Sequence, residues 1–293
     1  MKISVVVTNW NGIDLLQKNL ETIIKHSPEA DEIILADDDS EDNSISFAKK
    51  LQKKYSKLKI ISHKKNLGFG ENSNFAVNQA KGDLIVMLNN DIIPHPKFIT
   101  HSLKHFSDPK VFGVGFAELG HENWARFFWS EGYLQHEPGT NHINKTHISG
   151  WVSGGSSIIR KSLFQKLGGF DPIYKPFYGE DLDLGYRAWK SGYTLLWEPK
   201  SIVEHNHETT ISSFLQHLLN YVKERNRLLT TWRNISDSNL LLQNKLALIG
   251  RVLGGPNYIK IIRAAKKQIK NSSTPTVFPV LTDQEILAKF SHK

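Results

Sequence analysis

Runs of consecutive apolar residues alternate with helical apolar patterns through the first hundred residues of this chain. Strands that alternate with helices form parallel sheets with right-handed crossovers, so the pattern predicts an α/β fold with a mainly parallel central sheet flanked by helices. The apolar runs, predicted as buried strands, span residues 3–7, 32–36, 58–62 and 84–88. The segments with helical spacing span residues 13–25, 45–55 and 71–80.

The rest of the chain is less regular. Residues 105–160 hold an aromatic-rich stretch, and within it residues 153–160 are predicted as a strand, followed by a helix that begins at Lys161. From residue 211 the pattern is mainly helical, with a break at Gly254-Gly255-Pro256. The expected organisation is an α/β domain with two halves, residues 1–100 and 101–210, followed by a basic, helical C-terminal extension over residues 211–293.

Each predicted strand of the first hundred residues is followed by small, polar or acidic residues. The carboxyl ends of parallel strands share one edge of a sheet, and ligands bind in the crevice outside that edge. One such loop is a weak signal, because Asp, Asn and Gly also make ordinary turns. Four of them at one edge indicate a binding site. The four segments are residues 8–12, 37–44, 66–70 and 89–91.

The acidic character of this edge indicates a metal ion or a ligand rich in hydroxyl and N–H donors. Asp91 follows an apolar strand, and a hard cation such as Mg²⁺ takes one or two carboxylates together with water and substrate phosphates. Asp37, at the end of another strand, is placed to accept hydrogen bonds from a base or a ribose. The chain lacks both the glycine-rich dinucleotide motif and the Walker A lysine motif, which argues against those two nucleotide folds.

Three carboxylates, Glu180, Asp181 and Asp183, follow the aromatic stretch 174–179. Acidic residues are favoured in the first turn of a helix, where they complement the helix dipole. A carboxylate beside aromatics that wall a pocket also suits a general base. The spacing further predicts an ion pair between Asp183 and Arg187, four residues apart on one helix face.

The 293 residues include no cysteine, which excludes disulfides and thiolate metal sites and fits a reducing compartment. No apolar segment approaches the roughly 20 residues of a membrane span, and the N-terminal apolar run is too short for the core of a signal peptide. We therefore expect a cytoplasmic protein. The histidines at 136, 142 and 147 lack tight metal spacing and are expected at the surface.

The formal charge of +8 is concentrated near the C-terminus, where residues 238–282 include seven basic residues and no acidic one. A basic segment interleaved with apolar residues suits an anionic membrane surface, and a solvated helical face explains the same charges. We expect peripheral contact with the inner face of the cell membrane. Because no recognised nucleic-acid-binding motif is present, we expect no nucleic-acid partner.

Several short motifs follow one another between residues 2 and 230. They are SVVVTNWNG (4–12), LADDDSEDNS (35–44), NLGFG (66–70), MLNND (87–91), GGFD (168–171) and EDLD (180–183), with Asn74, His205 and Arg225-Asn226. In this order and spacing they resemble the inverting glycosyltransferases of family 2, which have the GT-A fold, and among these the bacterial rhamnosyltransferase-like branch.

The resemblance implies roles at the sheet edge. Asp91 and His205 would contact Mg²⁺ or Mn²⁺, with His207 as an alternative to His205. Asn89 replaces the first acid of the usual Asp-x-Asp motif, which implies weaker or differently arranged metal binding. The donor-binding residues, with Asp37 on the base, would be Thr8, Asn9, Asn11, Asp37, Asp39, Asn66, Gly68, Phe69, Asn74, Asn89 and Asn90.

The resemblance also resolves the acid cluster. Asp181 would act as general base with Glu180 beside it, while Trp151 and Tyr178 would contact the acceptor. The implied reaction moves a sugar from a nucleoside-diphosphate sugar, dTDP-rhamnose or a UDP-sugar, to an acceptor hydroxyl with inversion. The implied acceptor is a lipid-linked glycan of cell-surface polysaccharide synthesis, and the metal would aid departure of the diphosphate.

Two other functions stay open on the residues alone. Asn89 is compatible with a catalytically inactive module that binds sugar nucleotides. A nucleotidyltransferase shares a related α/β layout, but the glycine-rich, lysine-bearing N-terminal loop of that chemistry is absent. Activity that depends on Asp181 would separate a transferase from a binding module.

Overall fold

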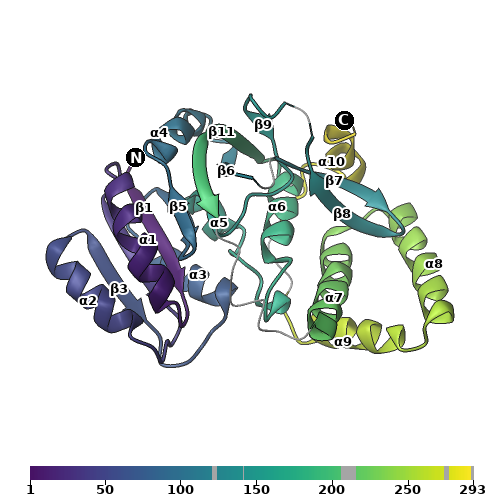
Figure 1. Ribbon diagram of the computed structural model, residues 1–293. Helices are drawn as coiled ribbons and strands as arrows, with labels where there is room; N and C mark the ends of the chain where they lie inside the picture. The colour runs from purple at the N-terminus through teal and green to yellow at the C-terminus, as the bar shows by residue number, and fades with distance from the viewer. Residues whose placement is uncertain (121–123, 141, 206–215, 274–276, 292–293) are drawn as a thin grey trace.

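The structure is a computed structural model that describes residues 1–120, 124–140, 142–205, 216–273 and 277–291. A large twisted sheet occupies one side of the molecule, and the C-terminal helices α7, α8 and α9 lie at the other (Figure 1). The main sheet consists of β1 (Ile3–Asn9), β2 (Glu32–Asp37), β3 (Leu58–Ser62), β4 (Leu84–Asn89), β5 (Ile92–Pro94), β6 (Val111–Glu118), β9 (His147–Ile148), β10 (Ser156–Arg160) and β11 (Thr194–His205).

The first half of the sheet is parallel, as the alternating pattern predicts. Its strand order is β3-β2-β1-β4. The register places Asn9 opposite Asp37 and Thr8 opposite Asn89, so the ends of three strands meet at one edge. The connecting helices are α1 (Ile13–His26), α2 (Ser44–Lys54) and α3 (Phe69–Gln79).

The second half of the sheet is mixed. β10 runs antiparallel between β4 and β6, and β11 pairs in parallel with β6. β5 and β9 each pair antiparallel with β11. The sequence pattern did not predict β11, whose pairing with β6 is interrupted between Glu198 and Ile202. A break of this kind destroys the regular alternation that marks a strand.

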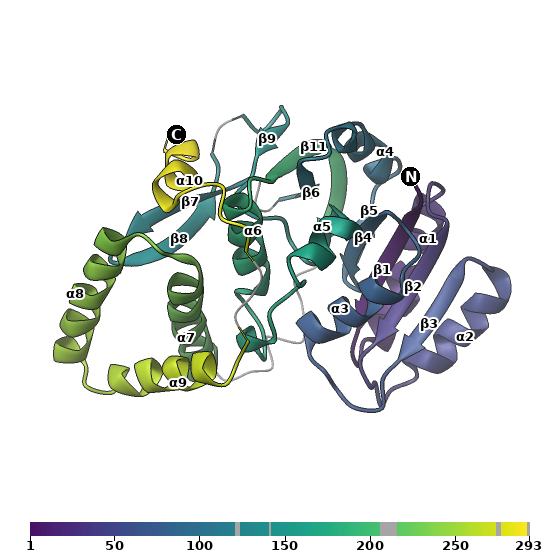
Figure 2. The same ribbon diagram turned by 180° about the vertical axis from the view of Figure 1, so that it is seen from behind.

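Both faces of the sheet are covered, so its strands are apolar on both sides. Val5 and Val7 of β1 pack in one core cluster with Leu16 of α1. Val6, between them, points to the opposite face and packs with Ala76 and Val77 of α3. Figure 2 shows α3 and α5 (Lys161–Lys166) on that second face. This double coverage explains why the strands appear as continuous apolar runs.

The remaining elements build the walls beside the sheet. α6 lies between the sheet and α7, and the hairpin β7–β8 lies over one end of α7 (Figure 1). Their bounds are α4 (Phe98–Leu103), a 3-10 turn (Lys104–Ser107), β7 (Ala125–Ser130), β8 (Tyr133–Pro138), a second 3-10 turn (Pro172–Tyr174), α6 (Glu180–Lys190), α7 (Gln216–Asn234), α8 (Ser238–Gly254), α9 (Tyr258–Lys270) and α10 (Asp283–Lys289).

The C-terminal segment packs in two apolar clusters, one between α7 and α9 and one at the end of the chain. Leu228 and Leu229 of α7 pack with Ala265 of α9 in a separate apolar cluster. At the end of the chain, Phe290 belongs to the same core cluster as α3 and packs edge-to-face on Trp189 of α6. The boundary predicted at residue 210 lies outside the described residues and stays a prediction. Among the described helices, none is both long and apolar enough to cross a bilayer.

Candidate active site

A cavity of about 1260 Å³ lies between the carboxyl ends of the parallel strands, the start of α6 and one face of α7. It brings together residues that are far apart in the sequence, and thirteen of the predicted site residues line it. These are Thr8, Asn9, Asn66, Gly68, Phe69, Asn89, Asn90, Asp91, Trp151, Tyr178, Glu180, Asp181 and His205. Four predicted donor-binding residues are not part of the lining: Asn11, Asp37, Asp39 and Asn74.

Hydrogen bonds tie the strand ends into one rigid edge. Asn90 donates through Nδ2 to Oδ1 of Asn9 at 2.7 Å, and Asn9 donates through Nδ2 to Asp37 at 2.8 Å. Thr8 donates through Oγ1 to Oδ1 of Asn89 at 3.2 Å. Gly12 allows this packing, because a Cβ there would lie 2.1 Å from Nδ2 of Asn90. The asparagine-rich ends of β1 and β4 therefore position one another.

In the acidic segment at the end of β2, Asp37 makes internal hydrogen bonds, whereas Asp38 faces the cavity. The carboxylate of Asp37 is buried, and it accepts hydrogen bonds from Asn9 and from both the amide and the hydroxyl of Ser40. Asp38, one residue later, lines the cavity and accepts from the amides of Leu67 at 2.7 Å and Gly68 at 2.8 Å. Sequence reasoning missed Asp38, although it belongs to the same run of three aspartates.

Of the other three residues outside the lining, Asn74 and Asn11 have structural contacts. Asn74 accepts from the amide of Phe170 at 2.9 Å and donates to its carbonyl at 2.8 Å, which fastens α3 to the GGFD turn. Asn11 accepts from the amide of Glu41, so it joins the loops after β1 and β2. Asp39 is exposed and adopts a positive φ of 66°. None of these contacts tests a donor-binding role.

The candidate metal ligands meet where β4 ends beside β11. His205, the last residue of β11, pairs with Ile92, which places it next to Asp91. His205 Nε2 lies 3.3 Å from Asp91 Oδ1, and His205 Nδ1 lies 2.9 Å from Glu118 Oε2. Burial opposes the charge on His205, but the carboxylates of Asp91 and Glu118 outweigh burial and raise its pKa to about 9.

This arrangement fits a divalent cation held jointly by protein and substrate. Asp91 Oδ1 is buried and lies 3.3 Å from His205 Nε2, so both candidate ligands face the same point. Within the described ranges there is no cluster of three His, Cys, Asp or Glu side chains arranged for a metal. Mg²⁺ commonly takes only one or two protein carboxylates and completes its shell with water and phosphate oxygens. His207, the alternative ligand, lies outside the described residues.

The acid cluster opens α6 and faces the cavity. Glu180 is buried, and its Oε2 has no hydrogen-bond partner among the described residues. Burial, then the negative charges of Asp181 and Asp183, raise the pKa of Glu180 to about 8. Asp181 is only half-buried. At neutral pH Glu180 is therefore mainly protonated beside a more accessible carboxylate, which is how an acid and a base are separated in adjacent positions.

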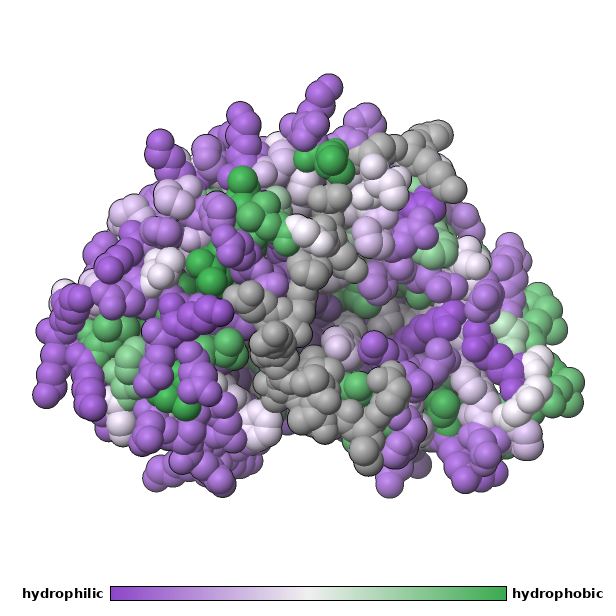
Figure 3. All heavy atoms as spheres, in the orientation of Figure 1, coloured by the Kyte–Doolittle hydropathy of each residue, from purple (hydrophilic) through white to green (hydrophobic). Residues whose placement is uncertain are grey.

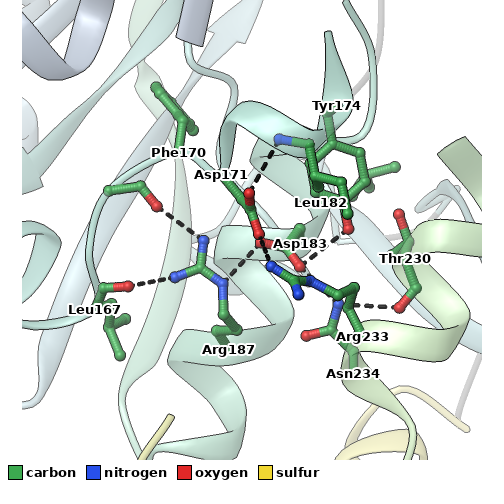
Figure 4. A network of polar contacts seen from close by, with 12 residues as sticks. Leu167, Phe170, Asp171, Tyr174, Leu182, Asp183, Arg187, Thr230, Arg233 and Asn234 are labelled. Atoms are coloured by element: carbon green, nitrogen blue, oxygen red, sulfur yellow. Dashed lines mark hydrogen bonds and ion pairs between the residues drawn. The ribbon is translucent and has the colours of Figure 1, made fainter. Parts of the chain in front are cut away.

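Asp183 points away from the cavity and holds the fold, and its predicted ion pair with Arg187 is confirmed. Arg187 Nε lies 2.7 Å from Asp183 Oδ2, with both side chains buried. Arg187 also donates to the carbonyls of Leu167 and Gly169. Tyr174 and Asn234 donate to Asp183 Oδ1 (Figure 4). The network joins α6 to the GGFD turn and to α7, so it fixes where the acid cluster begins.

Asn226 of α7 holds the loop that precedes α6. Its Nδ2 donates to the carbonyls of Tyr174, Phe177 and Tyr178 at 3.0, 2.9 and 2.6 Å. Tyr178 has a positive φ of 70°, an uncommon and costly conformation for a residue with a side chain. Arg225 donates to Asn226 Oδ1 and to the carbonyl of Lys175. Arg225 and Asn226 belong to the motifs that carry the family resemblance, but the sequence predicted no role for them.

The far wall of the cavity is aromatic and basic. Trp151 presents a buried indole N–H that has no acceptor among the described residues. His136, expected simply at the surface, lines the cavity and lies edge-on to Trp151. Lys175, Lys223 and Arg227 line the same side. His147 was also expected at the surface, but it is half-buried and stacks on Trp124 with ring centroids 3.9 Å apart.

Curated relatives of this chain are glycosyltransferases. It is 24% identical over 224 residues to an O-antigen chain rhamnosyltransferase of Salmonella typhimurium, covering 72% of this chain and 68% of that protein. It is 27% identical over 199 residues to a putative glycosyltransferase of Bacillus subtilis, covering 66% of this chain and 68% of that protein. A shorter match, 36% over 85 residues, covers 28% of this chain and 25% of an N-acetylglucosaminyl-diphospho-decaprenol L-rhamnosyltransferase of Mycobacterium tuberculosis.

Solved glycosyltransferases share the fold. GalNAc-T7 in complex with UDP, GalNAc and Mn²⁺ matches with a TM-score of 0.63 and 18% identity. The match covers 84% of this chain and 54% of the GalNAc-T7 chain. A mannosyltransferase from Pyrobaculum calidifontis with GDP-Man and Mn²⁺ matches with a TM-score of 0.60 and 15% identity. The match covers 92% of this chain and 80% of the mannosyltransferase chain. The fold is therefore that of the GT-A glycosyltransferases, as expected.

The family follows from the sequence profile that spans the parallel half of the sheet and the strands beside it. Glycosyl transferase family 2 matches residues 4–168, which is more than half of the chain. The matched segment contains the strand ends that line the cavity, including Asn89, Asn90 and Asp91. The chain therefore belongs to glycosyl transferase family 2.

Proposed function

We propose that this protein transfers a sugar from a nucleoside-diphosphate sugar to an acceptor hydroxyl with inversion at the anomeric carbon. One observation carries the proposal: a single cavity joins the strand-end residues of a nucleotide edge to the carboxylates that open α6. A protein that only binds sugar nucleotides would need the nucleotide edge but not the carboxylates that open α6. Donor and acceptor can therefore meet in one enclosed space, where orientation alone lowers the barrier substantially.

In the proposed mechanism Asp181 is the general base. It accepts the proton of the acceptor hydroxyl while that oxygen attacks the anomeric carbon from the face opposite the diphosphate. The bond from the anomeric carbon to the diphosphate oxygen breaks, and the diphosphate leaves with the bonding electron pair. Glu180, protonated at neutral pH because of its raised pKa, adds no second negative charge beside the attacking oxygen and can donate a hydrogen bond.

Asp91 and His205 would hold Mg²⁺ or Mn²⁺, with His205 giving up the Nε2 proton that faces Asp91 and Glu118 orienting the imidazole. When bound, the cation supplies positive charge that stabilises the diphosphate leaving group. The solved GT-A neighbours that contain Mn²⁺ support this choice of metal. Around the ion, Asn89, Asn90 and Thr8 present amide and hydroxyl groups to the polar part of the donor.

The relatives favour a rhamnosyl or hexosyl donor, so dTDP-rhamnose and UDP-sugars are the first candidates. On the acceptor side, Lys223 brings a positive charge to the cavity wall, while Lys175 and Arg227 line it as partners of Glu71 and Glu224. Trp151 and Tyr178 offer ring faces on which a sugar can stack. A glycan linked to a lipid through phosphate fits this combination, and we propose such an acceptor, used in cell-surface polysaccharide synthesis at the inner face of the membrane.

The decisive experiment compares Asp181→Asn with the wild type in donor binding and in transfer. We expect Asp181→Asn to keep donor affinity and to lose transfer by about 10²- to 10⁴-fold, the usual contribution of a general base. Asp14→Asn is the matched control, because Asp14 is also an acid in the first turn of a helix but lies exposed on α1. Full transfer by Asp181→Asn would show that the base is another group.

The alternative function, a catalytically inactive sugar-nucleotide-binding module, makes a different prediction. Asn89 favours it, because the first acid of the metal motif is missing. A wild-type protein that binds dTDP-rhamnose or a UDP-sugar yet neither transfers nor hydrolyses it, with Mn²⁺ present and acceptor lipids supplied, would establish this alternative.

A further inference from the structure

One face of α8 is apolar and uncovered. Leu242, Leu246, Ile249 and Leu253 are 55%, 61%, 58% and 81% exposed. Their spacing of four, three and four residues places them in a single row along the helix. Figure 3 shows the resulting apolar surface at the right-hand edge of the molecule, over α8. Single exposed leucines are ordinary, but a contiguous row of large apolar side chains marks an interaction surface.

The opposite face of α8 anchors the helix to the protein. Leu240 and Asn244 are buried there. Asn244 donates to the carbonyl of Gly132 at 2.7 Å and accepts from the indole of Trp232 at 2.8 Å. The uncovered row therefore lies on a helix whose opposite face is packed against the rest of the protein.

Exposed basic residues lie on α8 and on the helix that follows it, and Glu131 is an acidic residue that reaches α8, where it pairs with Arg251. Lys245 on α8 and five residues of α9 are exposed, and residues 238–282 contain no Asp or Glu. The exposed basic residues of α9 are Lys260, Arg263, Lys266, Lys267 and Lys270. An apolar row beside unneutralised basic residues is the composition of helices that lie in the interface of an anionic bilayer.

The charge also argues against a second copy of this chain as the occupant. Two such surfaces facing one another would bring together two sets of unpaired positive charges, whose repulsion opposes association. No described helix can cross a bilayer, so α8 would lie in the plane of the membrane and not span it.

We propose that α8 docks this protein on an anionic lipid bilayer, with Leu242, Leu246, Ile249 and Leu253 entering the interface and the basic residues of α9 contacting lipid headgroups. The hairpin β7–β8 connects this surface to the cavity: Asn244 bonds to Gly132 at the hairpin turn, and Leu134, Gln135 and His136 of β8 line the cavity. Docking would hold the acceptor side of the cavity close to the membrane surface.

The proposal agrees with a lipid-linked acceptor but can be tested without donor or acceptor, so its failure and failure of the proposed transfer are distinguishable. The chain contains no cysteine, so Leu246→Cys introduces a single thiol for an environment-sensitive fluorophore. Leu119→Cys is the matched control, because Leu119 is 49% exposed and lies far along the chain from α8. On vesicles of about three parts phosphatidylcholine to one part phosphatidylglycerol, we expect a blue shift at position 246 and none at 119.

Flotation of the full chain with the same vesicles gives the affinity. Leu246→Ser combined with Ile249→Ser should weaken binding at least about tenfold, because apolar burial of two large side chains is lost, while Leu119→Ser should not. Each basic residue of α9 changed to Gln should weaken binding about fivefold at low salt. Both α8 substitutions are at exposed positions, and thermal unfolding checks that they leave the fold intact.

Three results would overturn the proposal. One is equal vesicle binding by the double variant and the wild type. Another is equal binding of the wild type to pure phosphatidylcholine vesicles, which would remove the anionic surface as the partner. The third is concentration-dependent dimerisation that the double variant abolishes, with no recruitment to vesicles, which would make a second copy the occupant.

Discussion

At the scale of single residues, the chemistry depends on which of several adjacent acids faces the cavity. Asp37 and Asp38 are neighbours in the sequence. The Asp37 carboxylate accepts internal hydrogen bonds from Asn9 and Ser40, whereas Asp38 lines the cavity. Glu180 and Asp181 face the cavity, whereas Asp183 is committed to Arg187. Residue type predicted the acidic sites, but only the direction of each side chain assigned the roles.

Glu180 makes stability depend on pH. Its folded-state pKa of about 8 lies above the ordinary value of 4.5, so folding favours the protonated acid. The corresponding stability is complete below pH 4.5 and is lost as the pH rises toward 8. Glu180→Gln cannot ionise, so at pH 8 it should exceed the wild type in unfolding free energy by about 2–4 kcal/mol, with little difference at pH 4.5. Urea denaturation at the two pH values measures this, and parallel pH profiles would contradict it.

At the scale of secondary-structure elements, the start of α6 is set by buried polar contacts. Asp183→Ala would leave the Arg187 guanidinium buried without its carboxylate, so we expect a loss of about 3–5 kcal/mol in unfolding free energy. The matched control is Glu21→Ala, which removes the exposed pairs with Lys25 and Lys54 and a hydrogen bond from Tyr55, and should cost much less stability than Asp183→Ala. Urea denaturation of both variants tests the contrast, and similar losses in the two would contradict it.

The loop before α6 depends on α7 in the same way. Asn226→Ala removes one donor group that serves three loop carbonyls, so the acceptor wall around Tyr178 should lose its fixed position. We expect transfer to fall about tenfold or more through a higher acceptor KM, while donor affinity measured by calorimetry stays unchanged. Equal losses of donor affinity and of transfer would instead indicate general damage to the fold.

At the scale of the whole molecule, the two halves of the sheet contribute one proposed metal ligand each. Asp91 follows β4 in the parallel half, and His205 ends β11 in the mixed half. Removal of divalent cations with EDTA should lower nucleotide-sugar affinity and transfer by about tenfold or more, and Mn²⁺ should restore both. Asp91→Asn should reduce this restoration. Unchanged affinity in EDTA, measured by the ligand-induced rise in Tm, would show binding without a metal.

The sequence by itself determined the parallel half of the fold and predicted thirteen of the residues that line the cavity. Strands buried on both faces appear as apolar runs, and a parallel sheet places the residues after those runs at one edge, so local pattern was sufficient there. The tertiary structure alone decided how the strands of the mixed half pair, the choice of Asp38 over Asp37 for the cavity wall and the contacts of Asn226 with the loop before α6. It also decided which apolar face of α8 stays uncovered. These features depend on contacts between residues far apart in the chain, such as Asn226 with Tyr178, and periodicity reports only on neighbours along the sequence.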